Sequence, residues 1–152
     1  GSGLLRRYRF LRVAASSNSM NNPLGALAPY KSNGGQHAEV EAMYRIVVTY
    51  WSAVKAAFPE AWGKDPRHSR LMHSAGLVAM GLLMDRIYAR LSVEDDVAAV
   101  RRELEKIASV CRWTEGNWGS LGVAWNEIQN TPQDIKKLQD VLVRAYTMST
   151  KR

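Results

Sequence analysis

The apolar positions of this chain include one long run that carries no formal charge when His73 is neutral. It covers Leu71–Met84, fourteen residues with the sequence LMHSAGLVAMGLLM. A helix that is apolar on every side has to be covered on every side. The pattern therefore predicts a buried central helix over about residues 67–91. Its small residues Gly76, Ala79 and Gly81 indicate places where another helix approaches closely.

Apolar residues at three- and four-residue steps predict further helices around this central one. The clearest of them covers residues 38–58 and ends at Pro59. Others are predicted over about residues 4–15, 93–110 and 132–148. We therefore expect an all-α fold, with residues 4–148 forming a single domain of about five helices.

Two long segments, residues 16–36 and 112–130, have no helical period and are rich in turn-forming residues. The second contains three tryptophans, which usually anchor a loop to the core, and one helical turn is expected near residues 124–128. Trp62, in the turn after Pro59, is predicted to be a similar anchor. The first three residues, Gly-Ser-Gly, read as an expression scar, and residues 149–152 as a frayed tail.

Composition narrows the class of protein. The chain has 152 residues, of which 46% are hydrophobic, and this suffices for the core of one domain. No apolar run reaches the roughly twenty residues that a membrane-spanning helix needs, and no signal-peptide pattern is present. Cys111 is the only cysteine, which excludes an intrachain disulfide and a cysteine-based zinc site. We expect a cytoplasmic protein with no membrane partner and no cofactor.

The charge is unevenly placed. Lys and Arg total 21 against 14 acids, a formal charge of +7, which favours a polyanionic partner. Within residues 4–15 an apolar face is predicted, with four arginines around it: Arg6, Arg7, Arg9 and Arg12. These arginines form either a solvated helix surface or a nucleic-acid-binding face that contacts phosphates.

The order of elements resembles the C-terminal helical region of DGQHR-domain proteins, the group that includes DndB. The resemblance lies in an aromatic-rich helix that ends in the Phe58-Pro59-Glu60-Ala61-Trp62 turn, the small-residue run SAGLVAMGLLMDRI, the segment Trp113–Trp125 and the helix after Thr131. It covers about two thirds of the chain. The signature Asp-Gly-Gln-His-Arg is absent, because Gly34-Gly35-Gln36-His37 lacks the preceding Asp and Ala38 stands in place of Arg.

If the resemblance holds, the chain is the C-terminal domain of a longer parent protein. The resemblance implies a role in a bacterial DNA-modification or phage-defence system. In that family, DndB is associated with regulation through DNA binding. The N-terminal domain of the parent protein would then be a partner.

Catalytic motifs are scarce. Neither a phosphate-binding loop, a dinucleotide fingerprint nor a nucleophile elbow is present. His37 and Glu41 are two candidate metal ligands without a third, so we predict no metal site. Arg67, His68 and His73 fit the loose Arg-polar-x-x-x-x-His pattern of HEPN ribonucleases, in which a histidine acts as general base and an arginine stabilises phosphate charge. The alternative is a purely structural role, in which this segment forms a solvated first helical turn and His73 is a partly buried histidine.

The leading hypothesis is a non-catalytic helical accessory domain of a DGQHR-like bacterial protein, which serves DNA binding or assembly. A HEPN-like, metal-independent ribonuclease is one alternative. A domain for oligomerisation, including homo-oligomerisation, or for another protein interaction is the other.

Overall fold

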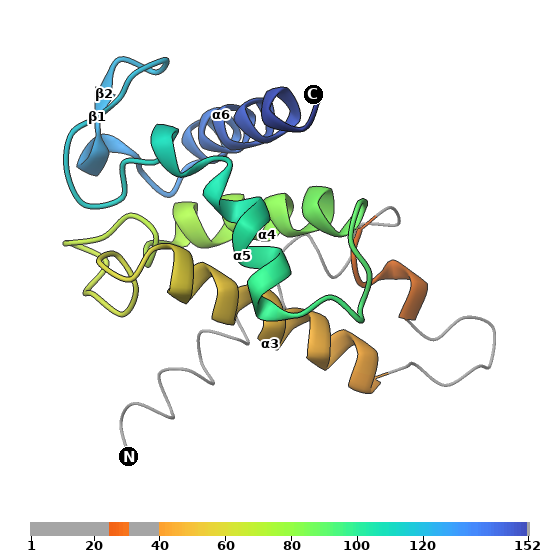
Figure 1. The fold of residues 1–152 in the computed structure, drawn as a ribbon. Coiled ribbons are helices and arrows are strands. Elements are labelled where there is room, and N and C mark those ends of the chain that lie inside the picture. Colours follow the sequence, from red (N-terminus) through yellow and green to blue (C-terminus); the bar gives the residue numbers. More distant parts are fainter. Residues whose placement is uncertain (1–24, 31–39, 152) are drawn as a thin grey trace.

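The computed structural model describes residues 25–30 and 40–151, and this part of the chain is mostly helical and broadly all-α (Figure 1). Its α-helices are α3 (Val40–Ala57), α4 (Ser74–Tyr88), α5 (Val97–Glu105) and α6 (Pro132–Thr150). Short 3-10 helices are η1 (Ala28–Tyr30), η2 (Ala108–Val110) and η3 (Trp125–Glu127). The predicted helix over residues 4–15 lies outside the described residues, as does the loop 16–36 except for residues 25–30.

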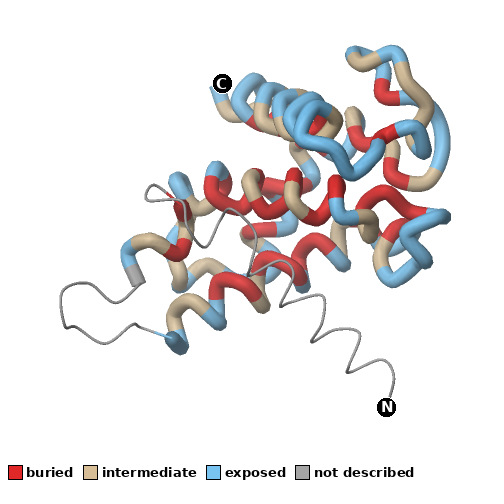
Figure 2. Tube along the Cα trace, turned by 180° about the vertical axis from the view of Figure 1, so that it is seen from behind, coloured by how far each residue is buried: buried red, intermediate tan, exposed pale blue. Residues whose placement is uncertain are grey.

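The helices pack in two pairs, α3 against α5 and α4 against α6. Figure 2 shows the buried positions concentrated in the middle of the molecule. The inner face of α3 begins later than the sequence pattern predicts, because Val40 and Tyr44 are 64% and 66% exposed while Ile46 is 2% exposed. Only the last three turns of α3 therefore contribute strongly to the core.

Helix α4 buries ten of its fifteen residues, but the prediction that this helix spans residues 67–91 is wrong at both ends. Residues before Ser74 form turns instead: the Asp65 carboxylate accepts the Arg67 N–H at 2.9 Å, and the Arg70 carbonyl accepts the His73 N–H at 3.3 Å. These side-chain and backbone bonds satisfy groups that a continuous helix would have bonded internally.

Gly76 explains why this turn can lie against α4. A Cβ at that position would be 1.9 Å from the Arg70 carbonyl oxygen, which no real side chain tolerates. The close approach predicted at the small residues therefore exists at Gly76, but the neighbour is the preceding turn and not another helix.

The predicted irregular segment 112–130 contains a small antiparallel hairpin, in which β1 (Asn117–Trp118) pairs with β2 (Val123–Ala124). Helix η3 lies where one helical turn is predicted. Trp118 is 1% exposed and packs edge-to-face on Trp113 at 5.2 Å between ring centroids. We call residues 59–73 and 111–131 together the loop layer.

Helices α5 and α6 differ from the prediction at their ends. Helix α5 is shorter than the predicted helix over residues 93–110 and is followed by η2, and its charged residue Glu103 is only 8% exposed. Its carboxylate accepts the Lys106 ammonium at 2.5 Å and the Tyr146 hydroxyl at 3.2 Å, which makes its burial tolerable. Helix α6 starts as predicted, with a Thr131 cap and Pro132 in its first turn, but it continues two residues beyond Met148.

Within residues 25–30 and 40–151, no helix is both long and apolar enough to cross a bilayer.

Candidate functional site

The sequence-predicted nucleic-acid-binding residues are Arg6, Arg7, Arg9 and Arg12, and all four lie outside the described residues. His37, one of the two weak metal-ligand candidates, also lies outside them, while Glu41 is an exposed residue of α3. In the described part of the chain no three His, Cys, Asp or Glu side chains are grouped so that they could hold a metal ion.

Arg67 and His68, from the ribonuclease pattern, are exposed in the turn before α4. The Arg67 guanidinium pairs with Asp65, at 3.1 Å between Nε and Oδ1. Bonds from the Arg67 side chain and backbone hold the pKa of the Asp65 carboxyl below its usual range. This exposed pair closes the turn locally.

His73 caps helix α4. Its Nδ1 accepts the Ala75 N–H at 3.2 Å, so the imidazole proton is on Nε2. Partial burial, with a smaller contribution from the charge of Arg70, lowers the pKa of His73 and favours this neutral form. The structure thus gives Arg67 and His73 separate structural bonds, and the ribonuclease hypothesis stays a prediction.

Arg70 is the residue that sequence reasoning missed. It belongs to the segment that the alternative to the ribonuclease pattern predicts as a solvated helical turn, but it is only 9% exposed. Its Nη1 donates to the Pro66 carbonyl at 3.0 Å and its Nη2 to the Asn126 carbonyl at 2.6 Å, while the guanidinium carbon lies 6.0 Å from the centroid of the Trp125 ring. Its backbone N–H donates to the Trp113 carbonyl at 2.8 Å. Arg70 therefore joins the two segments of the loop layer.

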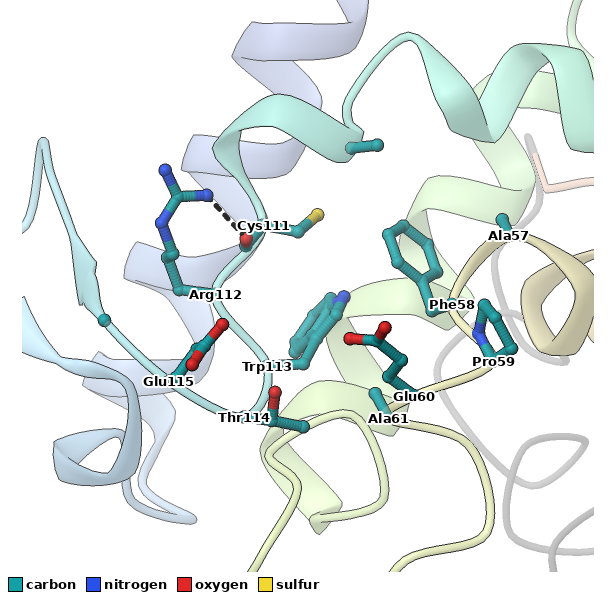
Figure 3. Close-up of a pocket in the computed structure, with 12 residues that line it drawn as sticks. Ala57, Phe58, Pro59, Glu60, Ala61, Cys111, Arg112, Trp113, Thr114 and Glu115 are labelled. Carbon is teal, nitrogen blue, oxygen red and sulfur yellow. Dashed lines mark hydrogen bonds between the residues drawn. The ribbon is translucent and has the colours of Figure 1, made fainter.

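A first cleft, of about 610 Å³, lies between residues 57–61 and residues 108–116 (Figure 3). Its lining includes Phe58 and Trp113, whose rings pack edge-to-face at 6.2 Å, and the carboxylates of Glu60 and Glu115 belong to it as well. Figure 3 shows the two segments on opposite sides of the cleft.

Cys111 also lines this first cleft but is unsuited to nucleophilic chemistry. Its thiol donates to the Ile107 carbonyl at 3.4 Å, and burial raises the pKa of Cys111 well above its ordinary value. The thiolate, which is the reactive form, is therefore scarce at neutral pH.

A second cleft, which we call the hairpin groove, lies between the β1–β2 hairpin and α6 and has a volume of about 520 Å³. Its apolar lining includes Leu121, Val141 and Met148, the last of which is 67% exposed. Three cations line it as well: Arg112, Lys137 and Arg144.

These cations are largely uncompensated. Asp140 is the one acidic residue in the groove lining, and no carboxylate of the described residues forms an ion pair with Lys137 or Arg144. Nη1 of Arg112 donates to the carbonyls of Ser109 and Cys111 at 2.9 and 2.7 Å, and its other nitrogens have no partner in the described part. The groove therefore combines apolar side chains with a net positive charge.

Comparison with family models, with characterised proteins and with solved structures finds no match to this chain.

Proposed function

We propose that this chain is a non-catalytic helical accessory domain of a DGQHR-like bacterial protein, which serves DNA binding or assembly in a DNA-modification or phage-defence system. The observation that carries the proposal is the hairpin groove, where Lys137 and Arg144, which form no ion pair in the described part of the chain, line the same cleft as the exposed side chain of Met148. Such a surface fits recognition of a partner. The structural bonds of Arg67 and His73 support an accessory role over the ribonuclease alternative.

We also propose that the complete domain is a bundle of about five helices with α4 at its centre. The burial of ten α4 residues and the contact of α4 with α6 support this arrangement. The helix predicted over residues 4–15 would supply the fifth member, and its apolar face would pack on the bundle.

DNA is the first partner to test. Four arginines within residues 4–15 would neutralise several phosphates and release their counterions, so binding would weaken steeply with salt. Since no base-reading motif accompanies them, we expect sequence-tolerant binding with a dissociation constant of about 10⁻⁴–10⁻⁶ M at physiological salt.

The test titrates labelled duplex DNA, duplex RNA and single strands at several salt concentrations. A variant with Ala at positions 6, 7, 9 and 12 should lose binding, whereas the matched variant with Lys at all four should keep most of it, because phosphate contact needs charge more than guanidinium shape. Absence of binding by the wild type at low salt would remove DNA from the proposal and leave assembly. Cleavage of RNA that His73→Asn abolishes would contradict the non-catalytic role itself.

A further inference from the structure

The hairpin groove has a composition that phosphate binding alone does not explain. Three cations would suffice to contact phosphates, but the groove also holds Val110, Leu121, Val141 and Met148. Met148 is 67% exposed in this structure. Covering so exposed an apolar side chain with a partner lowers the free energy, because it removes apolar surface from water. Duplex DNA presents a polar, charged backbone and would leave the Met148 side chain in contact with water.

The charges and the length of the hairpin groove together indicate one kind of ligand. Along α6 the groove extends from Lys137 to Met148, which corresponds to about 16 Å of helix axis, or three helical turns. An amphipathic helix of similar length places apolar residues at i, i+3, i+4 and i+7 on one face. Acidic residues beside that face would meet Arg112, Lys137 and Arg144.

We propose that the hairpin groove is the docking site for an acidic amphipathic helix of a partner protein. The apolar face of that helix would cover Leu121, Val141 and Met148, and its carboxylates would pair with Lys137 and Arg144. Arg112 would contribute the guanidinium nitrogens that its two backbone bonds leave available. This inference rests on the proposed accessory role. It names the chemistry of the partner with which the domain would assemble.

The experiment uses a labelled synthetic peptide of about fourteen residues, with leucines at i, i+3, i+4 and i+7 and glutamates flanking them. Two matched peptides separate the contributions. One replaces every glutamate with glutamine, and the other keeps the composition but scatters the leucines around the helix. Binding to the full chain is followed by fluorescence anisotropy.

The variants test the groove directly. Lys137→Glu combined with Arg144→Glu should weaken binding by about tenfold or more, because like charges then face one another. Met148→Gln should weaken it several-fold and, being at an exposed position, should leave the fold intact. Lys136→Glu is the matched control: Lys136 is exposed on the same helix and does not line the groove. We expect it to change binding by less than about twofold.

Each of five results would overturn the inference. In the peptide titrations they are no binding of the acidic amphipathic peptide and equal binding of the scattered-leucine peptide. In the variants they are equal loss in Lys136→Glu, and loss of duplex DNA binding in the groove variants without peptide binding by the wild type. The fifth is a concentration-dependent dimer that Met148→Gln abolishes, because a second copy would then occupy the groove. The nucleic-acid titration of the variants at positions 6, 7, 9 and 12 tests the DNA-binding proposal on its own. Failure of that proposal can therefore be told apart from failure of the docking proposal.

Discussion

The helical part of the molecule and the loop layer both contain buried polar groups, but they satisfy those groups differently. Among the helices, the Asp85 carboxylate accepts the Ala26 N–H at 2.9 Å, the Tyr50 hydroxyl donates to the Met80 carbonyl, and Glu103 is bonded to Lys106 and Tyr146. In the loop layer, three buried polar atoms have no hydrogen-bond partner: Ser69 Oγ, Arg70 Nε and Trp118 Nε1.

The two regions are therefore stabilised by different kinds of contact. Apolar contact between helices is non-directional and tolerates small shifts. The loop layer depends instead on a few directed bonds of Arg70 and on packed indole rings, and each unpaired donor there lowers its net stability. We infer that the loop layer opens before the helices do.

The largest expected effect comes from removing a fully buried ring. Trp118→Ala should lower the free energy of unfolding by about 3–5 kcal/mol, and Leu83→Ala in α4 by about 2–5 kcal/mol. Urea unfolding followed by circular dichroism checks both. If Trp118→Ala unfolds with the midpoint of the wild type, the loop layer does not contribute to the stability of the helices.

A second prediction concerns the link within the loop layer. Arg70→Met keeps most of the side-chain stem but removes the bonds to Pro66 and Asn126, and it should lower stability by about 1.5–3 kcal/mol. Hydrogen exchange should show faster exchange in residues 111–131 than in α4. Arg67→Met is the control, and its unfolding midpoint should match the wild type because that side chain is exposed.

The third prediction tests the contact between the turn and α4. Gly76→Ala places a Cβ against the Arg70 carbonyl and should cost about 1–3 kcal/mol, despite the better helix propensity of alanine. Gly119→Ala is the matched control, because a Cβ there meets nothing within 4 Å. Equal melting temperatures for the two variants would mean that the turn does not lie where the structure has it.

The smallest effect depends on pH. The pKa of His73 is lowered in the folded chain, so its contribution to stability is present above the unfolded pKa of about 6.5 and is lost as pH falls through the folded pKa. Protonation of Nδ1 also ends its bond to Ala75 N–H. His73→Asn should keep a cap and remove this pH dependence.

Unfolding free energies measured at about pH 7.5 and about pH 5 supply the comparison. The exposed His68→Asn should behave as the wild type does at both values. If His73→Asn retains the full wild-type difference, other groups cause the pH dependence.

The helices were predictable where local signals suffice. Helix α6 starts at Thr131 and Pro132 because a cap and a proline act within one turn, and the later half of α3 follows its apolar period. The start of α4 was not predictable, since Arg70 is held by Asn126, a residue 56 positions away. Strands of two residues are too short to show alternation, so the sequence pattern does not reveal the hairpin.

The candidate groove could not be predicted from the sequence. Lys137 and Arg144 are exposed residues of the predicted last helix, but no pattern marks them as part of a site. That the hairpin lies opposite them is a tertiary fact, because Leu121 and Met148 come together through packing and no local pattern in the sequence records their proximity. The arginines at positions 6, 7, 9 and 12 remain a sequence prediction.

The pairing of α4 with α6 has a consequence during protein synthesis. The two helices are separated by the residues between Tyr88 and Pro132, so α4 leaves the ribosome well before the helix that covers it. At about 5–20 residues per second the delay amounts to several seconds, far longer than a helix needs to form. During that interval the surface of α4 that α6 later buries has no helix to cover it.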